Sequence, residues 1–246
     1  MMLRNLKFTI EYDGTRYFGW QRQIQTPTLQ QTLEETLEKI IQKKVHLVAS
    51  GRTDRGVHAL AQIAHLKLDT HLTNTQLQKG LNALLPADIK IKEIETVSEN
   101  FHAQLHAKSK IYRYQIYNFP TASAVYRNQS CWISHPLNIE LMKQAANLII
   151  GEHDFKAFQN AGTQVPSTIR KIYRSEIYEK PPFLIYEVEG NGFLKQMVRN
   201  IVSALCEVGK SRLSIDAFET LLKSKNRRLG PKSAPPQGLF LVEVFH

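Results

Sequence analysis

The stretch from Ser50 to Ala59 holds the residue types in this sequence that could most readily do chemistry. It reads Ser-Gly-Arg-Thr-Asp-Arg-Gly-Val-His-Ala, lies between two apolar segments, and has the glycines and small polar residues typical of a shaped loop. Arg52 and Arg55 flank its single carboxylate, Asp54, and nearby cations favour the ionised form of an aspartate. An ionised aspartate can act as a nucleophile or a general base, and arginines can hold phosphates or stack on bases. The alternative is that Asp54 caps a turn and both arginines face solvent.

A second candidate site begins at Lys108 and reads Lys-Ser-Lys-Ile-Tyr-Arg-Tyr. On a strand, Lys108, Lys110, Tyr112 and Tyr114 share one face, because successive side chains alternate between the two faces. Rings that stack on an unpaired base, together with lysines that hold phosphate, are typical of a strand that binds nucleic acid. We take Lys108, Lys110, Tyr112 and the intervening Arg113 as candidate substrate contacts. The alternative is an amphipathic strand whose lysine stems cover apolar surface.

A third candidate is Arg199, which lies in a largely apolar stretch, residues 193–202, with helical spacing. A partly buried arginine needs an anionic partner. Asp54 is a candidate for that partner, because acidic residues are otherwise scarce in these motifs. The alternative is that Arg199 lies on the polar side of its helix and faces solvent.

The sequence gives no sign of a metal or a cofactor. His102 and His106 are four residues apart, but the segment around them reads as loop or strand, where that spacing does not favour a shared metal site. Cys131 and Cys206 stand far apart with no Cys-x-x-Cys, which excludes a disulfide framework, a cysteine-based zinc site and a cysteine-ligated iron–sulfur cluster. Nucleotide-binding glycine-rich motifs and His-Glu-x-x-His are also missing. Catalysis is therefore expected to use ordinary side chains.

The charge of the chain indicates a polyanionic partner. Lys and Arg number 32 against 22 Asp and Glu, which gives a net charge of +10 and a pI near 9.6. Residues 106–246 carry 19 of the basic and 11 of the acidic residues, so the excess lies mainly in the second half. A basic chain most often meets nucleic acid. No apolar run approaches the ~18 residues of a membrane span and the first residues show no signal peptide, so we expect a cytoplasmic protein without membrane contact.

Apolar periodicity predicts the same order of elements, β-α-β-β-α-β, in each half of the chain. Alternation predicts strands, and a spacing of three or four predicts helices. In the first half we expect strands over 8–12, 45–49, 61–68 and 89–97, and helices over 26–40 and 77–85. In the second half we expect a strand over 111–118, a helix over 141–149, a hairpin of 169–178 and 183–189, helices over 197–209 and 214–223, and a strand over 239–244.

This order predicts an α+β fold of two tandem ferredoxin-like or RRM-like units, residues 1–105 and 106–246, each with helices on one face of an antiparallel sheet. Two such sheets side by side would leave a long open face suited to an extended polymer. The first unit would carry Asp54, and the second would carry Tyr112 and Arg199. The segment 212–237 is polar and rich in proline, glycine and lysine, especially over 223–232, and it is expected to be a flexible basic loop, either at the RNA-facing rim or simply solvated.

Short motifs along nearly the whole chain resemble those of the tRNA pseudouridine synthase A family. Each motif is a weak signal alone, but their joint order and spacing are specific. In chain order they are Tyr12-Asp13-Gly14-Thr15, Gly19-Trp20-Gln21, Gly51-Arg52-Thr53-Asp54, Gly56-Val57-His58-Ala59, Leu81-Asn82, Leu85-Pro86, Phe101-His102-Ala103, Tyr112-Arg113-Tyr114, His153-Asp154-Phe155, Met197-Val198-Arg199-Asn200, Ala234-Pro235 and Gly238-Leu239.

The resemblance implies an isomerase, an intramolecular transferase, that converts uridine to pseudouridine in the anticodon arm of tRNA at positions 38, 39 and 40. It implies two tandem units with a central catalytic cleft, and a homodimer in which one tRNA touches both subunits. It assigns Asp54 as the essential aspartate, Arg199 as its ion-pair partner, and Tyr112 as the ring packed against the target base. Arg52 matches an arginine that helps to extrude the target nucleotide, and Tyr112 is also a candidate acceptor of the C5 proton. An isomerisation needs no cofactor, in agreement with the missing motifs.

Three positions depart from the family pattern. Arg55 stands where alanine is usual, Gln104 where arginine is usual, and Ser203 where glycine is usual. Arg55 and Gln104 could change how RNA is gripped, so they bear on the target position more than on the chemistry. Two alternatives therefore stay open, which are a non-catalytic RNA-binding module on the same fold and a pseudouridine synthase with another RNA target position. The intact set of Asp54, Tyr112 and Arg199 argues against the first, because a pure binder has no use for a carboxylate near phosphates.

Overall fold

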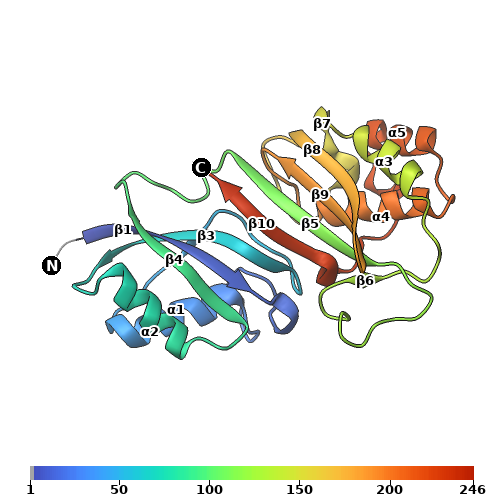
Figure 1. Ribbon diagram of the computed structural model, residues 1–246. Helices are drawn as coiled ribbons and strands as arrows, with labels where there is room; N and C mark the ends of the chain where they lie inside the picture. Colours follow the sequence, from blue (N-terminus) through green and yellow to red (C-terminus); the bar gives the residue numbers. More distant parts are fainter. Residues whose placement is uncertain (1–2) are drawn as a thin grey trace. The chain divides into compact units, whose positions relative to one another are not determined.

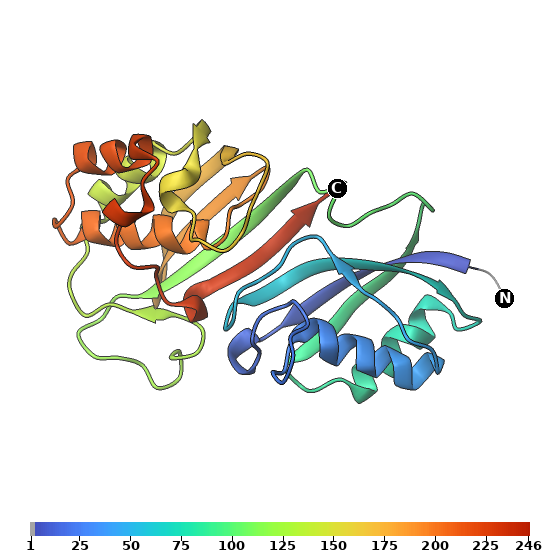
Figure 2. The same cartoon turned by 180° about the vertical axis from the view of Figure 1, so that it is seen from behind.

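The computed structural model describes residues 3–246, which fall into two compact units. Unit 1 consists of residues 3–108 together with 240–246, and unit 2 consists of residues 109–239. Each unit contains a mostly antiparallel sheet with helices packed on one face (Figure 1, and Figure 2 from behind). The predicted α+β class is therefore confirmed.

The sheet of unit 1 is built around β1 (Leu3–Tyr12), whose alternating apolar residues are buried as the sequence pattern predicts. β1 pairs antiparallel with β3 (His58–Asp69) on one side and with β4 (Ile89–Val97) on the other. The C-terminal strand β10 (Leu239–Phe245) pairs parallel with β3. The two-residue strand β2 (Val48–Ala49) also pairs with β3, and it is shorter than the strand expected over 45–49.

Two helices, α1 (Leu29–Ile41) and α2 (Asn74–Leu84), cover one face of this sheet. The predicted start of α1 at residues 26–27 is wrong by two to three residues, because Thr28 is the residue whose hydroxyl accepts a hydrogen bond from the backbone of Gln31. The apolar stripes that predicted both helices face the core, except for Leu84 at the end of α2, which is exposed. Their fully buried members are Leu29, Leu33, Leu37, Leu77 and Leu81.

The sheet of unit 2 has the order β5-β9-β8-β7, in which all neighbours are antiparallel. Its long strands are β5 (Ser109–Tyr117), β9 (Phe183–Gly190) and β8 (Ile169–Lys180), and β7 (Gly151–Asp154) forms one edge. The short strand β6 (Cys131–Trp132) pairs parallel with the end of β5. The predicted hairpin is confirmed, because β8 and β9 are joined by a tight turn.

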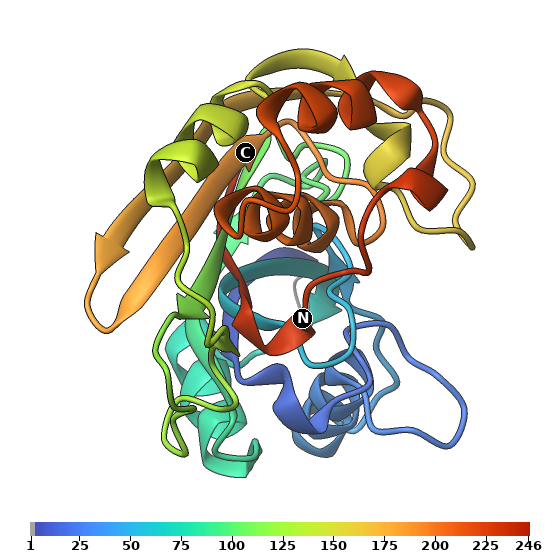
Figure 3. The same cartoon turned by 90° about the vertical axis from the view of Figure 1, so that its right-hand side faces the viewer.

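Unit 2 has three helices, α3 (Ile139–Asn147), α4 (Met197–Gly209) and α5 (Ile215–Ser224), which pack against one another on one side of the sheet (Figure 3). α4 begins and ends at the predicted residues and is mostly buried. Its apolar residues therefore form the centre of the core of unit 2. Four single-turn 3₁₀ helices complete the described chain, and they are Gly14–Arg16, Phe155–Phe158, Arg227–Leu229 and Pro236–Gly238.

The stretch 223–232 is attached to the rest of unit 2 by side-chain hydrogen bonds. Its first residues complete α5, and Arg227 begins a 3₁₀ turn. The Arg227 guanidinium points inward and donates hydrogen bonds to the side chains of Asn160 and Asn200 and to two backbone carbonyls. One of the charges that made the stretch look solvated therefore holds it to the rest of unit 2.

Residues 240–246 belong to unit 1 although they follow unit 2 in the chain. The division into functional domains 1–105 and 106–246 stays a prediction. None of the helices within residues 3–246 is long and apolar enough to cross a membrane.

Candidate active site

The loop from Ser50 to Val57 joins β2 to β3 and carries Asp54 at its half-buried centre. The loop begins where Ser50 N–H donates to the carbonyl of Ile63 at 2.7 Å. It turns sharply after Asp54, whose carbonyl accepts from Val57 N–H at 3.2 Å, and Gly56 has a φ of +76° at this turn. The backbone of Asp54 thus closes a turn.

The segment that follows β1 holds this loop from one side by backbone contacts. Trp20 N–H donates to the carbonyl of Thr53 at 3.0 Å, one residue before Asp54. Gly19 has a φ of +91°, and a Cβ there would lie 2.7 Å from the Thr53 oxygen. A Cβ on Gly14 would lie 2.0 Å from the carbonyl oxygen of Val57. Glycine is therefore required at both positions by the close approach of two backbones.

A buried group of polar side chains supports the loop from beneath. Tyr12 and Thr53 share a hydrogen bond of 2.8 Å between their hydroxyls. Gln62 is fully buried, and its amide donates to the Gly51 carbonyl at 2.8 Å while its Oε1 accepts from the Ser50 hydroxyl at 2.8 Å. Burial raises the pKa of Tyr12 far above its usual range, so the hydroxyl remains a neutral donor and acceptor.

The sequence analysis missed Tyr12, Ser50 and Gln62 as supports of the loop. A weak signal was present, because Gln62 is a polar residue in the middle of a strand that is otherwise largely apolar. A buried amide of this kind is found where it satisfies other buried polar groups.

The other end of the loop is anchored by His58, which is 2 % exposed. Its Nδ1 lies 3.1 Å from Oδ1 of Asp13 and 3.1 Å from the backbone nitrogen of Gly14. The hydrogen bond with His58, assisted by bonds from Thr15, holds the pKa of Asp13 far below its usual range. The His58 ring also stacks on Phe240 of β10, with centroids 4.6 Å apart. His58, the residue after the loop, is thus held by Asp13 on one side and by Phe240 on the other.

The two arginines that flank Asp54 differ in their surroundings. Both side chains are exposed. The guanidinium carbon of Arg55 lies 4.1 Å from the ring centroid of Phe18, a cation–π contact that the sequence analysis did not foresee. Arg55 is therefore held over a ring of the same unit.

Tyr112 and Lys110 lie on the same face of β5 in unit 2, as alternation predicts. The Tyr112 ring is 9 % exposed and meets Phe193 edge to face, with centroids 5.0 Å apart and an interplanar angle of 82°. Burial lowers the pKa of Lys110 to about 8. Lys108 is exposed, lies one residue before β5, and donates its backbone N–H to Phe245 at 2.8 Å. Phe193 is a further candidate site residue, because it fixes the edge of the Tyr112 ring.

Arg113 lies on the opposite face of β5 and forms an ion pair that the sequence did not reveal. Its Nε and Nη2 both lie 2.9 Å from Oε2 of Glu187 on the neighbouring strand. Arg174 reaches the second oxygen of Glu187 at 2.9 Å. Burial alone would raise the pKa of Glu187, but the two guanidinium groups outweigh it and lower that pKa. The predicted contact of Arg113 with RNA stays a prediction, and its shown partner is Glu187.

Arg199 lies near the start of α4, where it is half-buried. Its Nε donates to the carbonyl of Ala234 at 2.7 Å, and Ala234 N–H donates back to the carbonyl of Arg199 at 3.1 Å. The sequence-predicted residues thus divide between the units. Unit 1 brings Arg52, Asp54 and Arg55 into one loop, while unit 2 carries Tyr112 and Arg199.

His102 and His106 lie in a turn and not in a metal site. Nδ1 of His102 accepts from two backbone N–H groups, and Nδ1 of His106 accepts from one. No group of three or more His, Cys, Asp or Glu side chains between residues 3 and 246 is arranged to hold a metal ion. His65 lies beside them, with its ring centroid 4.8 Å from that of His102, and its Nδ1 accepts from Ala103 N–H at 3.2 Å.

We expect the stability of the protein to fall as the pH drops below the usual pKa of histidine, about 6.5. Burial lowers the pKa of His65, and the charge of nearby His102 lowers it further. Between the lowered pKa and the usual one, the unfolded chain binds a proton that the folded chain does not, so the free energy of unfolding rises with pH in that window. Urea unfolding at several pH values should show a shallower pH dependence for His65→Gln. The control His71→Gln, at an exposed position, should retain the wild-type dependence; an equal dependence in both variants would contradict the assignment.

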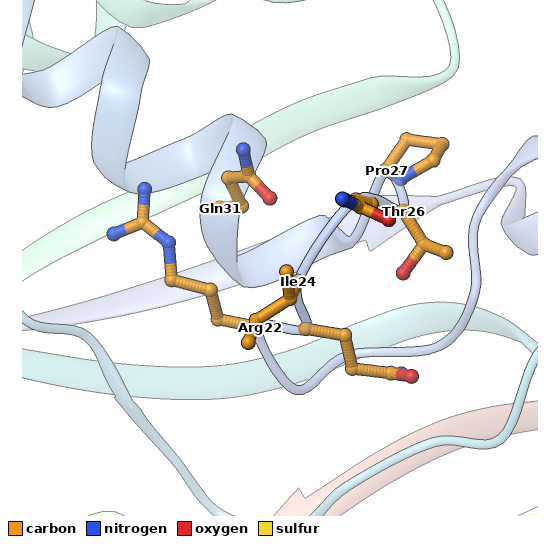
Figure 4. A pocket seen from close by; sticks show the side chains of 7 residues that line it. Arg22, Ile24, Thr26, Pro27 and Gln31 are labelled. Atoms are coloured by element: carbon orange, nitrogen blue, oxygen red, sulfur yellow. The ribbon is translucent and has the colours of Figure 1, made fainter.

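A hollow of about 640 Å³ lies in unit 1 beside the loop that precedes α1 (Figure 4). Its one charged side chain, Arg22, is paired with Glu34 at 3.4 Å and Glu35 at 3.3 Å. Its walls offer neither a carboxylate nor an imidazole, so the hollow lacks a group that could act as a general acid or base. Its lining residues are Arg22, Gln23, Ile24, Gln25, Thr26, Pro27 and Gln31.

Comparisons with known proteins cover almost the whole chain. The family model described as tRNA pseudouridine synthase matches residues 9–104 and 145–246. A protein of Ruminiclostridium cellulolyticum named tRNA pseudouridine synthase A is 44% identical over 245 residues, which cover 99% of this chain and 100% of that protein. Proteins of the same name from Thermoanaerobacter sp. (strain X514) and Geotalea uraniireducens are each 43% identical, over 245 and 244 residues, with 99% of this chain and all of the relative covered. The residues matched include the loop of Asp54 and the helix of Arg199.

Proposed function

The chain belongs to the tRNA pseudouridine synthase family, and from that premise we propose that it isomerises uridine to pseudouridine in the anticodon stem-loop of tRNA, at positions 38, 39 and 40. The observation that carries the proposal is the Asp54 loop, in which one carboxylate sits on a backbone fixed by hydrogen bonds and by two obligatory glycines. The net charge of +10 supports a polyanionic substrate.

The reaction breaks the N1–C1′ bond of uridine, turns the uracil, and joins C5 to C1′. The proton leaves C5 and N1 regains one, so no atom is added and no electron is exchanged with another reactant. The target base must first leave its stack, which costs a few kcal/mol. The protein therefore has to bind the extruded base, supply one ionised group at the sugar or base, and hold a proton acceptor near C5.

We assign these tasks to residues of both units. Asp54 acts as the nucleophile or as the base that removes a sugar proton, and Arg199 forms an ion pair with it. Tyr112 stacks on the extruded base, a contact worth ~1–3 kcal/mol, and accepts the C5 proton directly or through water. The edge-to-face contact with Phe193 supports this role, because it fixes the plane of the Tyr112 ring.

Further residues are assigned to substrate binding. Arg52 helps to extrude the target nucleotide, and its exposure supports this role. Lys108 and Lys110 contact phosphates. Arg113 contacts the RNA while it stays in its ion pair with Glu187. Arg55 lies over Phe18 and extends the cationic surface of the loop. We also propose that the protein acts as a homodimer in the cytoplasm, with one tRNA touching both subunits; the family resemblance supports this.

Position-resolved mapping tests the proposed function. Unmodified tRNA transcripts are incubated with wild-type protein and with Arg55→Ala, and carbodiimide labelling with primer extension then locates each pseudouridine. We expect product at positions 38, 39 and 40 with the wild type, with tRNA binding that weakens steeply as salt is raised. If the wild type forms pseudouridine at other positions and Arg55→Ala forms it in the anticodon arm, the proposed target of the wild type is wrong and Arg55 is the cause of the changed target. Tight tRNA binding with no product would favour the non-catalytic RNA-binding module.

A further inference from the structure

Arg227 in unit 2 makes an unusual set of contacts for a half-buried cation. Its Nε donates to Oδ1 of Asn160 at 2.9 Å, and its Nη2 donates to Oδ1 of Asn200 at 2.9 Å and to the Pro231 carbonyl at 2.7 Å. Its Nη1 donates to the Gly230 carbonyl at 3.1 Å. All four acceptors are neutral oxygens, and no carboxylate within residues 3–246 forms an ion pair with this guanidinium. Burial accordingly lowers the pKa of Arg227.

The two asparagines belong to a larger cluster of neutral polar side chains. The Ser233 hydroxyl lies 2.6 Å from Oδ1 of Asn200 and 3.0 Å from Oε1 of Gln196. The Asn200 amide donates to Oδ1 of Asn160 at 2.9 Å, and the Asn160 amide donates to Gln196. Gln196 has a φ of +59° and does not cap α4 with its side chain, which is directed into the cluster instead. We call these four residues and Arg227 the Arg227 cluster.

The Arg227 cluster joins two pieces of chain that meet at Arg199. One piece is the start of α4, where Asn200 directly follows Arg199. The other is the strap, residues 226–234, which places Arg227 near its start and Ser233 near its end in the cluster and ends at Ala234. Ala234 makes the pair of hydrogen bonds with the Nε and the carbonyl of Arg199. The strap is therefore bonded to the cluster near both of its ends, and its last residue, Ala234, is bonded to Arg199.

The bond from Nε of Arg199 to Ala234 sets the orientation of that guanidinium. Nε and the two terminal nitrogens are bonded to the same carbon in one rigid plane, so a hydrogen bond that fixes Nε restricts the direction in which the terminal nitrogens are presented. A shift of the strap would rotate the Arg199 group, because the Ala234 carbonyl would move with it.

A direct role for Arg227 in holding an RNA phosphate fits these contacts poorly. A guanidinium has five N–H donors, and protein oxygens already take four bonds from Arg227. A phosphate contact would need several of these donors at once. The hydrogen-bond donors of Arg227 are instead used within the protein, where they hold the neighbouring side chains and the strap in place.

We propose that Arg227 is a positioning residue, which holds the strap and α4 together so that Arg199 is presented to the reacting centre in one orientation. This inference rests on the role of Arg199 in the proposed function. The planar, branched guanidinium is required because it reaches Asn160, Asn200 and the strap at once. A lysine ammonium is a single point with three donors and cannot span them.

Three variants test the proposal on tRNA under single-turnover conditions with saturating enzyme. For Arg227→Met we expect the rate constant of pseudouridine formation to fall by about 30-fold, since misplacement of a catalytic group by ~1 Å costs on the order of 100-fold. The Kd for tRNA should change by less than about threefold, because the substituted group binds no RNA. Arg227→Lys should recover only part of the rate. The control Arg127→Met removes the same charge from an exposed arginine of unit 2 and should retain the wild-type rate.

A double-mutant cycle then asks whether Arg227 acts through Arg199. In an Arg199→Lys background, which has lost the Nε bond to Ala234, Arg227→Met should reduce the rate constant by less than about twofold further. The inference would be overturned if the two substitutions reduced the rate constant by independent factors that multiply, or if Arg227→Met weakened tRNA binding and left the rate constant unchanged.

If Arg227→Met does not fold, Ser233→Ala serves in its place, and we expect its rate constant to fall by about fivefold because its cluster hydrogen bonds are missing. If Arg199→Lys and Arg199→Ala both retain the wild-type rate constant, the role of Arg199 in the proposed function is refuted. If these variants are slow but Arg227→Met is fully active, only the present inference is refuted.

Discussion

Replacement of Asp54 by asparagine abolishes pseudouridine formation, with an expected loss of at least about 1,000-fold in the single-turnover rate constant. An amide has nearly the shape of a carboxylate but is neither a nucleophile nor a base at neutral pH. The backbone bonds that hold the loop come from Thr53, Gly56 and Val57, so its shape should survive the substitution. We therefore expect the Kd for tRNA to change by less than about threefold, because phosphate contacts dominate affinity.

The measurement combines a single-turnover assay with filter binding of the same tRNA. A matched control is Asp216→Asn, which removes an equal charge from an exposed position at the start of α5 and should leave the rate constant unchanged. Normal turnover by Asp54→Asn would show that the catalytic carboxylate has been wrongly assigned. Loss of tRNA binding together with loss of product would place Asp54 in the binding of RNA and not in the chemistry.

The second large effect is expected from Gly19→Ala. A Cβ at this position lies 2.7 Å from the Thr53 oxygen and 3.2 Å from the nitrogen of Arg55, and the φ of +91° is unfavourable for alanine. The loop must move away from the segment after β1, and Asp54 moves with it. We expect the rate constant to fall by about 100-fold, the usual effect of a displacement near 1 Å. The free energy of unfolding should fall by about 1–3 kcal/mol from the backbone strain, as measured by urea unfolding.

Gly80→Ala provides the control for this substitution. Gly80 lies inside α2, and a Cβ there meets only Cδ1 of Ile40 at 3.4 Å. Alanine is a better helix former than glycine, so the free energy of unfolding should rise by about 0.5–1 kcal/mol while the rate constant stays the same. If Gly19→Ala is as active as Gly80→Ala, the position of Asp54 does not depend on the contact with the segment after β1.

Elements set by local patterns were predictable from the sequence. The alternation in β1 and the helical spacing in α4 report which side chains are buried, and each pattern lies within one element. The start of α1 was predicted too early because residues 26 and 27 offered a plausible cap and first turn, whereas the observed cap is the next hydroxyl along the chain, Thr28.

The loop of Asp54 was identified from its residue types, but its supports were not. The contacts of Tyr12 with Thr53 and of Gly19 with the same residue join positions more than thirty residues apart, and periodicity carries no information on such pairs. Arg113 shows the same limit, because its predicted RNA contact came from its place on a strand, while its ion pair depends on which residue of β9 lies opposite. The contact of Arg227 with Asn200 likewise joins distant positions, which the composition of the stretch 223–232 does not reveal.

The pairing of β10 with β3 has a consequence for how the protein is made. Phe240, which stacks on His58, is synthesised more than 180 residues after it. While the ribosome is still translating unit 2, the nascent chain already contains every residue of the Asp54 loop but lacks the strand that covers its C-terminal anchor. The loop acquires this support only after residues 239–245 have left the exit tunnel. A chain that stops before residue 239 would therefore lack the strand that supports a functional segment made much earlier.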